Sequence, residues 1–185
     1  MPGKLVIISA PSGGGKNAII RVLVEKIPKS IRFLTTITRP MRPGEADGVD
    51  YHYISKAEFE QKILAGDFVE YNVYAGEYYG TDRLRLEQTL KDNEVIFLQI
   101  DVNGKRAMKK AGIKHTSIFI LPENLDSLRS RIEKRGGLSP EIIRERMGVA
   151  KDEIAAAKEY DYQVINPEGD MDTAVLRIMD ILSKI

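Results

Sequence analysis

Residues 9–20, SAPSGGGKNAII, combine a glycine-rich turn with a lysine in a pattern that suits the binding of phosphate oxygens. Glycines allow neighbouring backbone N–H groups to converge on an oxyanion, and Lys16 adds a mobile positive charge. The stretch departs twice from the pattern G-x-x-x-x-G-K-[ST]. Ala10 replaces the first glycine, and Asn17 replaces the hydroxyl residue that normally contacts the magnesium ion of a nucleotide. By itself, such a short pattern also fits a turn that carries a surface lysine.

The segments on either side favour a phosphate loop. KLVIIS, residues 4–9, is a continuous apolar run, as expected of a strand buried on both faces of a parallel sheet. Residues 18–26 carry apolar side chains at helical spacing, and Pro28 closes that helix. Strand, glycine-rich turn and helix in this order are the structural context that a phosphate loop requires.

A second candidate anion site lies in TTITRPMRPGEADGVDY, residues 35–51. Arg39 and Arg42 are three residues apart, and their guanidinium groups are suited to hold a phosphate with the hydroxyl of Tyr51 beside it. The alternative is a solvated basic loop without a ligand.

The tyrosine-rich segment FVEYNVYAGEYYGT, residues 68–81, brings Glu70, Tyr79 and Thr81 close together in sequence. A carboxylate flanked by hydroxyls suits the N–H edge of a guanine base. Packing of the tyrosines on an edge strand is the simpler alternative.

A third group of cations comprises Arg131 and Arg135, at i and i+4 of one expected helix, and Arg146 on the next. Like charges at this spacing destabilise a helix, so an anionic ligand would explain them. Surface pairing with Glu133, Glu141 and Glu145 would explain them equally well.

Composition limits the remaining classes of function. The chain has 185 residues, enough for one domain with a substantial core, and its net charge is only +1, from 28 basic and 27 acidic residues. No global field therefore favours nucleic acid. The absence of cysteine excludes disulfides and thiolate metal sites, and two histidines disfavour a histidine-based metal centre. No apolar stretch is long enough to span a bilayer or form a signal core, so we expect a cytoplasmic protein without a membrane partner.

The pattern along the chain alternates between expected strands and helices. Strands are expected at residues 32–38, 94–100, 115–121 and 162–165, and the S-x-x-E motif at Ser55 predicts a helix to about Ala65. Residues 67–80 look like a small antiparallel piece that interrupts the alternation. We therefore predict an α/β fold, a three-layer core around a parallel sheet, with an inserted lobe.

Taken together, the motifs resemble the guanylate kinase family over essentially the whole chain. PSG-x-GK, T-x-T-R-x-x-R-x-GE-x-x-G-x-x-Y, F-x-E followed by YYGT, IDVNG and R-x-x-x-RG occur in the family's order and at its spacing. The resemblance implies a single domain over 1–185, with a P-loop NTPase core (about 1–34, 82–124 and 160–185). It also implies a mixed or antiparallel GMP-binding lobe (about 35–81) and a helical lid (about 125–159). The implied activity is reversible transfer of the ATP γ-phosphoryl group to GMP, giving ADP and GDP.

The resemblance also implies a role for each matching residue. ATP would be bound by the loop residues Ala10, Pro11, Ser12, Gly13, Gly14, Gly15, Lys16, Asn17 and Ala18, with Asn166 at the adenine. GMP would be bound by Thr35, Arg39, Arg42, Tyr51, Glu70, Tyr79, Thr81 and Asp101. The catalytic cations would be Lys16, Arg42, Arg131, Arg135 and Arg146, which position the two phosphates and neutralise their charge.

Two departures from the family pattern fall on the magnesium side. Asn17 replaces a hydroxyl residue, and Gln99 stands where the family usually carries an acidic residue. Magnesium takes much of its coordination from water and from substrate phosphates, so a weaker protein contact still permits function. We therefore expect Mg²⁺ to enter with ATP, with a weak or water-mediated contact from Asn17 and an outer-sphere contact from Gln99.

The resulting hypothesis is an active guanylate kinase with loosened magnesium coordination and with ATP and GMP as its partners. One alternative is a catalytically silent guanylate-kinase-like module that binds proteins. Another is a kinase for a different nucleotide or a phosphorylated sugar, against which Glu70, Thr35 and Asp101 argue. The sequence leaves open whether the protein is a monomer or a homo-oligomer.

Overall fold

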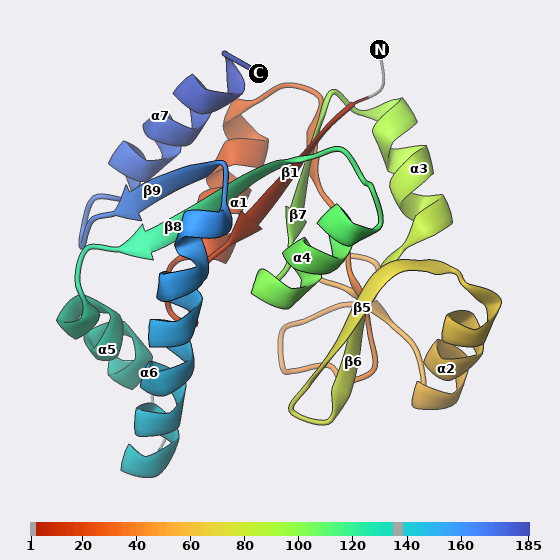
Figure 1. Ribbon diagram of the computed structural model, residues 1–185, viewed down its shortest axis with the longest axis horizontal. Helices are drawn as coiled ribbons and strands as arrows, with labels where there is room; N and C mark the ends of the chain where they lie inside the picture. The colour runs from red at the N-terminus through yellow and green to blue at the C-terminus, as the bar shows by residue number, and fades with distance from the viewer. Residues whose placement is uncertain (1–2, 135–138) are drawn as a thin grey trace. The chain divides into compact units, whose positions relative to one another are not determined.

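The structure, a computed structural model, describes residues 3–134 and 139–185 (Figure 1). The chain forms two compact units. The first comprises Met1–Val6 and Lys29–His115, and the second comprises Ile7–Pro28 and Thr116–Ile185. The single domain predicted from the sequence, with its core, lobe and lid boundaries, stays a prediction.

A five-stranded sheet supplies the parallel architecture that the apolar runs predict. Its strand order is β2-β7-β1-β8-β9, and the pairs β2–β7 and β8–β9 are parallel. The central strands are apolar on both faces, with Ile7, Phe97 and Phe119 fully buried. The α/β class is therefore confirmed. The strands are β1 (Lys4–Ser9), β2 (Ser30–Arg32), β7 (Val95–Gln99), β8 (Thr116–Pro122) and β9 (Tyr162–Asn166).

In the second unit, helices α1 (Lys16–Lys26) and α7 (Met171–Leu182) pack against each other, and α7 also packs against β9. Helices α5 (Leu125–Lys134) and α6 (Pro140–Ala155) pack around a small apolar core of Leu128, Ile132 and Ala150. A 3₁₀ turn, η1 (Ala156–Glu159), follows α6. The two helices expected after residue 124 thus share a core of their own.

The first unit contains the mixed sheet that the tyrosine-rich segment predicts. Its order is β4-β3-β6-β5, with β3 parallel to β4 and antiparallel to β6, and with β5 antiparallel to β6. The strands are β3 (Thr36–Ile37), β4 (His52–Tyr53), β5 (Phe68–Tyr74) and β6 (Glu77–Asp82). The helices of this unit are α2 (Lys56–Ala65), α3 (Arg83–Asp92) and α4 (Val102–Lys110).

Local signals place the ends of α2 as expected. The Ser55 side chain accepts from the Glu58 amide while the Glu58 carboxylate accepts from the Ser55 amide, which is the reciprocal capping box. Gly66 ends the helix in the left-handed conformation, at φ 73°.

The single strand predicted at residues 32–38 is wrong. The chain instead forms β2 and β3, which belong to different sheets. The Phe33 amide still donates to the Phe97 carbonyl at 2.9 Å, whereas Thr36 pairs with Gly80. Because residues 33–35 carry the chain from one sheet to the other, a continuous run of strand-forming residues conceals a change of partner.

Helix α1 begins at Lys16, two residues earlier than the apolar spacing indicates, so the lysine is part of the helix itself. None of the helices within 3–134 and 139–185 combines the length and the apolar character needed to cross a membrane.

Candidate functional site

The glycine-rich turn leads directly into an uncapped helix N-terminus. Gly13 and Gly15 adopt φ of 90° and 87°, which a residue with a side chain rarely does, and the Gly14 amide donates to the Pro11 carbonyl at 2.9 Å. Gly15 is the N-cap of α1 and supplies no side-chain hydrogen bond to the helix. The first amides of α1 therefore keep the positive end of the helix dipole available to an anion, with Lys16 beside them.

Ala10 fits the turn without distortion. It is 5% exposed, and its methyl group lies 2.9 Å from the position that a Cβ on Gly14 would occupy. The methyl of Ala10 thus fills space that a larger residue at position 14 would need. Its departure from the glycine of the consensus is mild, as its small size suggests.

Asn166, at the end of β9, lies beneath this turn. It is 4% exposed, and its Nδ2 donates to the Gly14 carbonyl at 3.0 Å. Its own carbonyl and that of Pro167 accept from Nη2 of Arg131, at 3.3 and 3.2 Å. The predicted contact of Asn166 with adenine stays a prediction. In the structure, its side chain is hydrogen-bonded to the glycine-rich turn.

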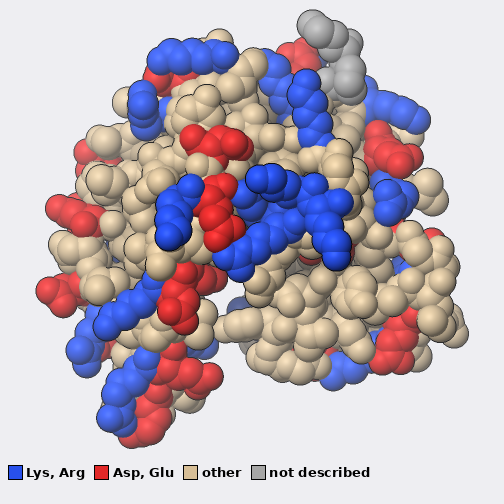
Figure 2. Space-filling model, viewed as in Figure 1, with Lys and Arg blue, Asp and Glu red and all other residues tan. Residues whose placement is uncertain are grey.

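Two of the three glutamates that could neutralise Arg131 and Arg146 bind other partners. Glu133 pairs with Arg129 and Glu141 with Arg144, at 3.0 and 3.1 Å. Figure 2 shows acidic and basic side chains side by side over the segment of α5 and α6 at the lower left. Arg146 is half-buried and forms no hydrogen bond or ion pair within the described part of the chain. Arg131 and Arg146 therefore remain candidates for an anion, whereas Arg135 lies outside the described residues.

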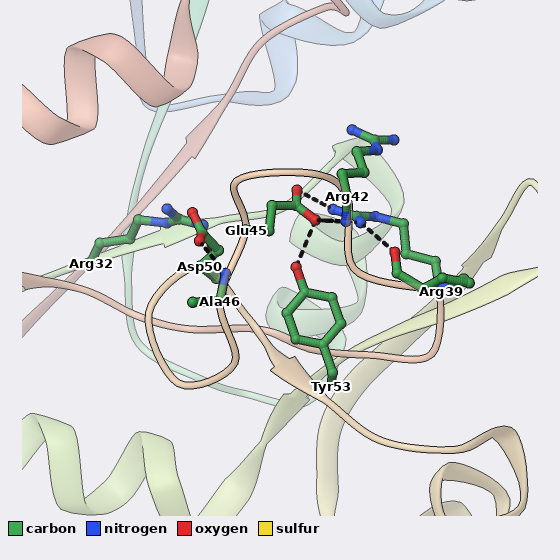
Figure 3. Close-up of polar contacts among 8 residues, drawn as sticks. Arg32, Arg39, Arg42, Glu45, Ala46, Asp50 and Tyr53 are labelled. Atoms are coloured by element: carbon green, nitrogen blue, oxygen red, sulfur yellow. Dashed lines mark hydrogen bonds and ion pairs between the residues drawn. The ribbon is translucent and has the colours of Figure 1, made fainter.

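In the loop between β3 and β4, Glu45 organises the predicted phosphate grip (Figure 3). Both carboxylate oxygens accept from Arg39, with Nη1 and Nη2 each at 2.7 Å. The same carboxylate accepts from the backbone amide of Arg42 at 2.9 Å and from the Tyr53 hydroxyl at 2.8 Å. Bidentate pairing fixes the plane of a guanidinium group as well as its position. Glu45 thus holds Arg39, Arg42 and Tyr53 in one arrangement.

The charges of this cluster stabilise each other. Hydrogen bonds from Arg39 are the main cause that lowers the pKa of Glu45 to about 2. Burial, followed by the hydrogen bond to Glu45, raises the pKa of Tyr53 to about 12. Glu45 is therefore ionised and Tyr53 neutral at physiological pH. The Arg39 side chain is only 10% exposed and is therefore not a solvated surface cation, whereas Arg42 is exposed.

Arg39 keeps hydrogen-bonding capacity for a ligand. A guanidinium group carries five N–H bonds. Two are given to Glu45 and one to the Pro40 carbonyl at 2.9 Å, and Arg39 also forms a hydrogen bond with the Tyr79 side chain, so at most one N–H is left for a ligand. The guanidinium of Arg42 points away from Glu45 in Figure 3. These donors are the groups that a phosphate would meet.

Tyr51 supports Arg39 through its ring. The Arg39 guanidinium lies 5.2 Å from the centroid of the Tyr51 ring, and the guanidinium of Arg32 lies 5.4 Å from the same centroid. Burial raises the pKa of Tyr79, and the charge of Arg39 opposes that rise. The predicted roles of both hydroxyls stay predictions.

A buried carboxylate lies on the mixed sheet. Glu70 is 6% exposed and accepts from the Thr81 hydroxyl at 2.5 Å. The two residues are directly opposite each other on β5 and β6 because a register shift between Phe68 and Glu70 changes the alternation there. Thr35, another residue of the predicted set, is 7% exposed in the segment before β3.

Asp101 and a further residue, Asn72, complete the surroundings of Glu70. Asp101 caps α4 by accepting from the Gly104 amide at 2.7 Å, and it accepts from Nδ2 of Asn72 at 2.6 Å. A Cβ on Gly104 would lie 3.1 Å from Oε2 of Glu70, so this glycine allows α4 to approach the carboxylate closely. The structure thereby brings Glu70, Thr81 and Asp101 together, and their contact with guanine stays a prediction.

Glu70 titrates far above an ordinary glutamate. Burial raises its pKa to about 7, the hydrogen bond from Thr81 opposes the shift, and the charge of Asp101 adds to it. A perturbed pKa at a buried carboxylate is typical of functional sites. Near neutral pH, Glu70 can therefore be protonated when no ligand is bound. When a ligand supplies N–H donors, it can be ionised and accept with both carboxylate oxygens.

Asn17 and Gln99 are the two side chains for which a magnesium contact is predicted. Asn17 is exposed at the start of α1, and Oε1 of Gln99 is buried without a hydrogen-bond partner among the described residues. A hard cation or a water bound to it suits both oxygens. Among the described residues, no group of three or more His, Cys, Asp or Glu could hold a metal on its own. Taken one at a time, each of these neutral oxygens suits a water molecule bound to a cation.

Sequence reasoning passed over Glu45, Tyr53 and Asn72. Glu45 stood in the R-x-GE motif, but nothing in the spacing indicated that it would take both arms of Arg39. Tyr53 lies two residues beyond Tyr51, and the two rings pack edge to face with their centroids 5.9 Å apart. Asn72 lies two residues beyond Glu70 on β5, so the alternation of a strand would have placed both side chains on the same face.

Comparisons with known proteins agree over almost the whole chain. The family model described as guanylate kinase matches residues 2–185. A guanylate kinase of Vibrio parahaemolyticus is 44% identical over 182 residues, which cover 97% of this chain and 87% of the relative. A guanylate kinase of Histophilus somni is 44% identical over 184 residues, with the same coverage of both chains.

A solved structure leads to the same family. The crystal structure of a guanylate kinase from Anaplasma phagocytophilum matches with a TM-score of 0.78 and 27% sequence identity. The match covers 99% of this chain and 86% of that one.

Proposed function

Since the chain belongs to the guanylate kinase family, we propose that it transfers the γ-phosphoryl group of ATP to GMP and forms ADP and GDP. The observation that carries the choice of acceptor is the buried Glu70, which Thr81 hydrogen-bonds. Guanine offers two adjacent donors, N1–H and the N2 amino group, and a carboxylate accepts from both. Adenine presents an unprotonated N1 at the corresponding position and would face the carboxylate with a lone pair.

The proposed reaction depends on positioning and charge neutralisation. An oxygen of the GMP phosphate forms a bond to the γ-phosphorus while the bond to the bridging oxygen breaks, and ADP leaves with the electron pair. Arg42 and Arg39 hold the acceptor phosphate. Lys16 and the first amides of α1 hold the donor phosphates, and Arg131, Arg135 and Arg146 supply further positive charge. An acceptor that is already anionic requires no general base.

Magnesium, bound with ATP, would neutralise charge on its phosphates. Asn17 and Gln99 would meet the ion or its waters with neutral oxygens, which contribute less electrostatic attraction than a carboxylate. We therefore propose that the protein binds magnesium more loosely than a chain with the usual residues at these positions.

Substitution of Asn17 by serine tests the proposed loose binding of magnesium. The shorter hydroxyl restores the usual phosphate-loop residue, and we expect the half-saturating Mg²⁺ concentration for GDP formation to fall about tenfold, the equivalent of one good interaction. The measurement is the rate of GDP formation across a magnesium titration at saturating ATP and GMP. Asn93→Ser, at the C-cap of α3, is the matched control. An unchanged titration in Asn17→Ser would remove the metal explanation.

Glu45 positions the acceptor grip and offers a separate test. Glu45→Gln keeps the shape but removes the charge that binds Arg39, so we expect KM for GMP to rise about tenfold with a smaller change in kcat. Steady-state kinetics with varied GMP provide the measurement. Glu94→Gln, which breaks an exposed pair with Lys29, should leave both constants unchanged. Equal KM values for native protein and Glu45→Gln would contradict the positioning role.

Two alternatives make different predictions in the assay of GDP formation. A silent binding module would bind GMP without producing GDP from ATP. A kinase for another nucleotide or phosphorylated sugar would turn over ATP with that acceptor faster than with GMP. The intact Lys16, Arg42 and Arg131 favour an enzyme, and Glu70 favours guanine. We further propose that residues 35–81 act as the GMP lobe and residues 125–159 as the lid, in a cytoplasmic protein.

A further inference from the structure

We infer that Asn166 is a positioning residue that holds the phosphate loop in its binding conformation, independently of any contact with adenine. This inference rests on the proposed use of the loop for ATP phosphates. It starts from the hydrogen bond between Nδ2 of Asn166 and the Gly14 carbonyl, which joins residues 152 positions apart and is buried.

The loop passes unusually close to the Asn166 amide. A Cβ built on Gly15 would lie 2.6 Å from Nδ2 of Asn166, so a side chain at position 15 would displace the Asn166 amide. Gly15 also has φ of 87°, which disfavours a side chain for a second, independent reason. The asparagine amide and the glycine therefore fit each other, and a side chain at position 15 would disturb the hydrogen bond to Gly14.

Fixing the Gly14 carbonyl also fixes the next amide. In a planar trans peptide, the C=O of residue 14 and the N–H of residue 15 point in opposite directions. With the carbonyl held on Asn166, the Gly15 N–H must point away from Asn166. Phosphate loops bind oxyanions through such N–H groups, so the side chain of Asn166 orients a phosphate donor that it does not itself touch.

The orientation of the Asn166 amide follows from its partner. Only the NH₂ group can donate to a carbonyl, so the contact with Gly14 determines which end of the amide faces the loop. Its Oδ1 is buried and has no hydrogen-bond partner within 3–134 and 139–185. A buried acceptor without a partner costs stability, so packing alone does not explain an asparagine here.

The backbone of the same residue engages the lid. The carbonyls of Asn166 and Pro167 hold Nη2 of Arg131 at 3.3 and 3.2 Å, both long for charged hydrogen bonds. A phosphate is a stronger partner for a guanidinium group than two carbonyls, so Arg131 can leave them for a bound nucleotide. Asn166 thus contacts the phosphate loop with its side chain and a lid arginine with its backbone.

Ligands with and without adenine separate the two roles of Asn166. Asn166→Ala removes the donor, and we expect it to weaken the binding of ADP and of inorganic tripolyphosphate by similar factors, each about tenfold. Binding is measured by isothermal titration calorimetry on the full chain, in the presence of Mg²⁺. Asn93→Ala, which removes the hydrogen bond from Asn93 to the Thr89 carbonyl, is the matched control and should bind both ligands as the native protein does.

A loss of ADP affinity with unchanged tripolyphosphate affinity would overturn the inference, because adenine contact alone would explain it. Failure of the native chain to bind tripolyphosphate would overturn it as well. GMP affinity, measured in parallel, should be unchanged in Asn166→Ala, and a parallel loss would indicate general damage and contradict a local role. Asn166→Asp, which turns an oxygen toward the Gly14 carbonyl, should bind tripolyphosphate no better than Asn166→Ala. Native chain that binds tripolyphosphate but forms no GDP would refute the proposed function and leave this inference intact.

Discussion

Replacing Lys16 with methionine is expected to lower kcat for GDP formation by about 10²–10³-fold, the usual cost of removing one preorganised charge from a transition state. Methionine keeps the length and helix propensity of lysine, so α1 should still begin at residue 16. Lys16 is the only cation in residues 9–20, and the amides around it are neutral donors. The remaining N–H groups of the loop should therefore hold phosphate without supplying the charge that transfer needs.

Rapid-quench measurement of a single turnover tests this directly, since it separates the chemical step from product release. Lys26→Met, in the last turn of the same helix, is the control and should retain the native rate. A Lys16→Met variant with a native single-turnover rate would show that this loop does not carry the donor phosphates.

Glu70→Gln is expected to have the second largest effect, with opposite consequences for activity and stability. Glutamine presents one acceptor and one donor where guanine presents two donors, so kcat/KM for GMP should fall about 10²-fold or more. In the folded protein the pKa of Glu70 is about 7, above the ordinary 4.5, so ionisation of Glu70 destabilises the fold as pH rises through this window. The variant should be more stable than the native protein at pH 8, by up to about 3 kcal/mol, and no more stable at pH 4.

Thermal unfolding at both pH values provides the stability measurement. KM for GMP in the native protein should also rise as pH falls below about 7, because only the ionised carboxylate accepts from both guanine donors. The phosphate of GMP titrates in a neighbouring range, and Glu70→Gln reports that contribution alone. Identical pH profiles of KM in the two proteins would contradict the assignment of Glu70 to the base.

The sequence predicts those features that depend on neighbours along the chain. Ser55 and Glu58 cap α2 because they are three residues apart, and the glycine-rich turn precedes α1 because apolar patterns mark the strand and the helix. The sequence also predicts that Glu70 is a carboxylate with a hydroxyl group nearby. The sequence does not predict that Glu70 lies opposite Thr81, because a bulge shifts the alternation without a clear signal in the residue types.

Contacts between distant residues account for the rest. The hydrogen bond from Asn166 to Gly14 joins positions that only the folded sheet brings together. Glu45 lies near Arg39 in sequence. Its carboxylate also accepts from the Tyr53 hydroxyl, and this contact depends on the path of the loop between them. The break between β2 and β3 likewise depends on distant partners, because β2 pairs with β7 in one sheet and β3 pairs with β6 in the other.

Acceptor selectivity tests the central claim most directly. The rate of ADP formation from ATP is measured with GMP, dGMP, AMP or UMP as the second substrate at equal concentration. We expect kcat/KM for GMP to exceed that for AMP and UMP by at least about 10³-fold, since a buried carboxylate rejects bases without paired N–H donors. Comparable rates with AMP or UMP, or no GDP from ATP and GMP at any magnesium concentration, would contradict the assignment of this chain as an ATP:GMP phosphotransferase.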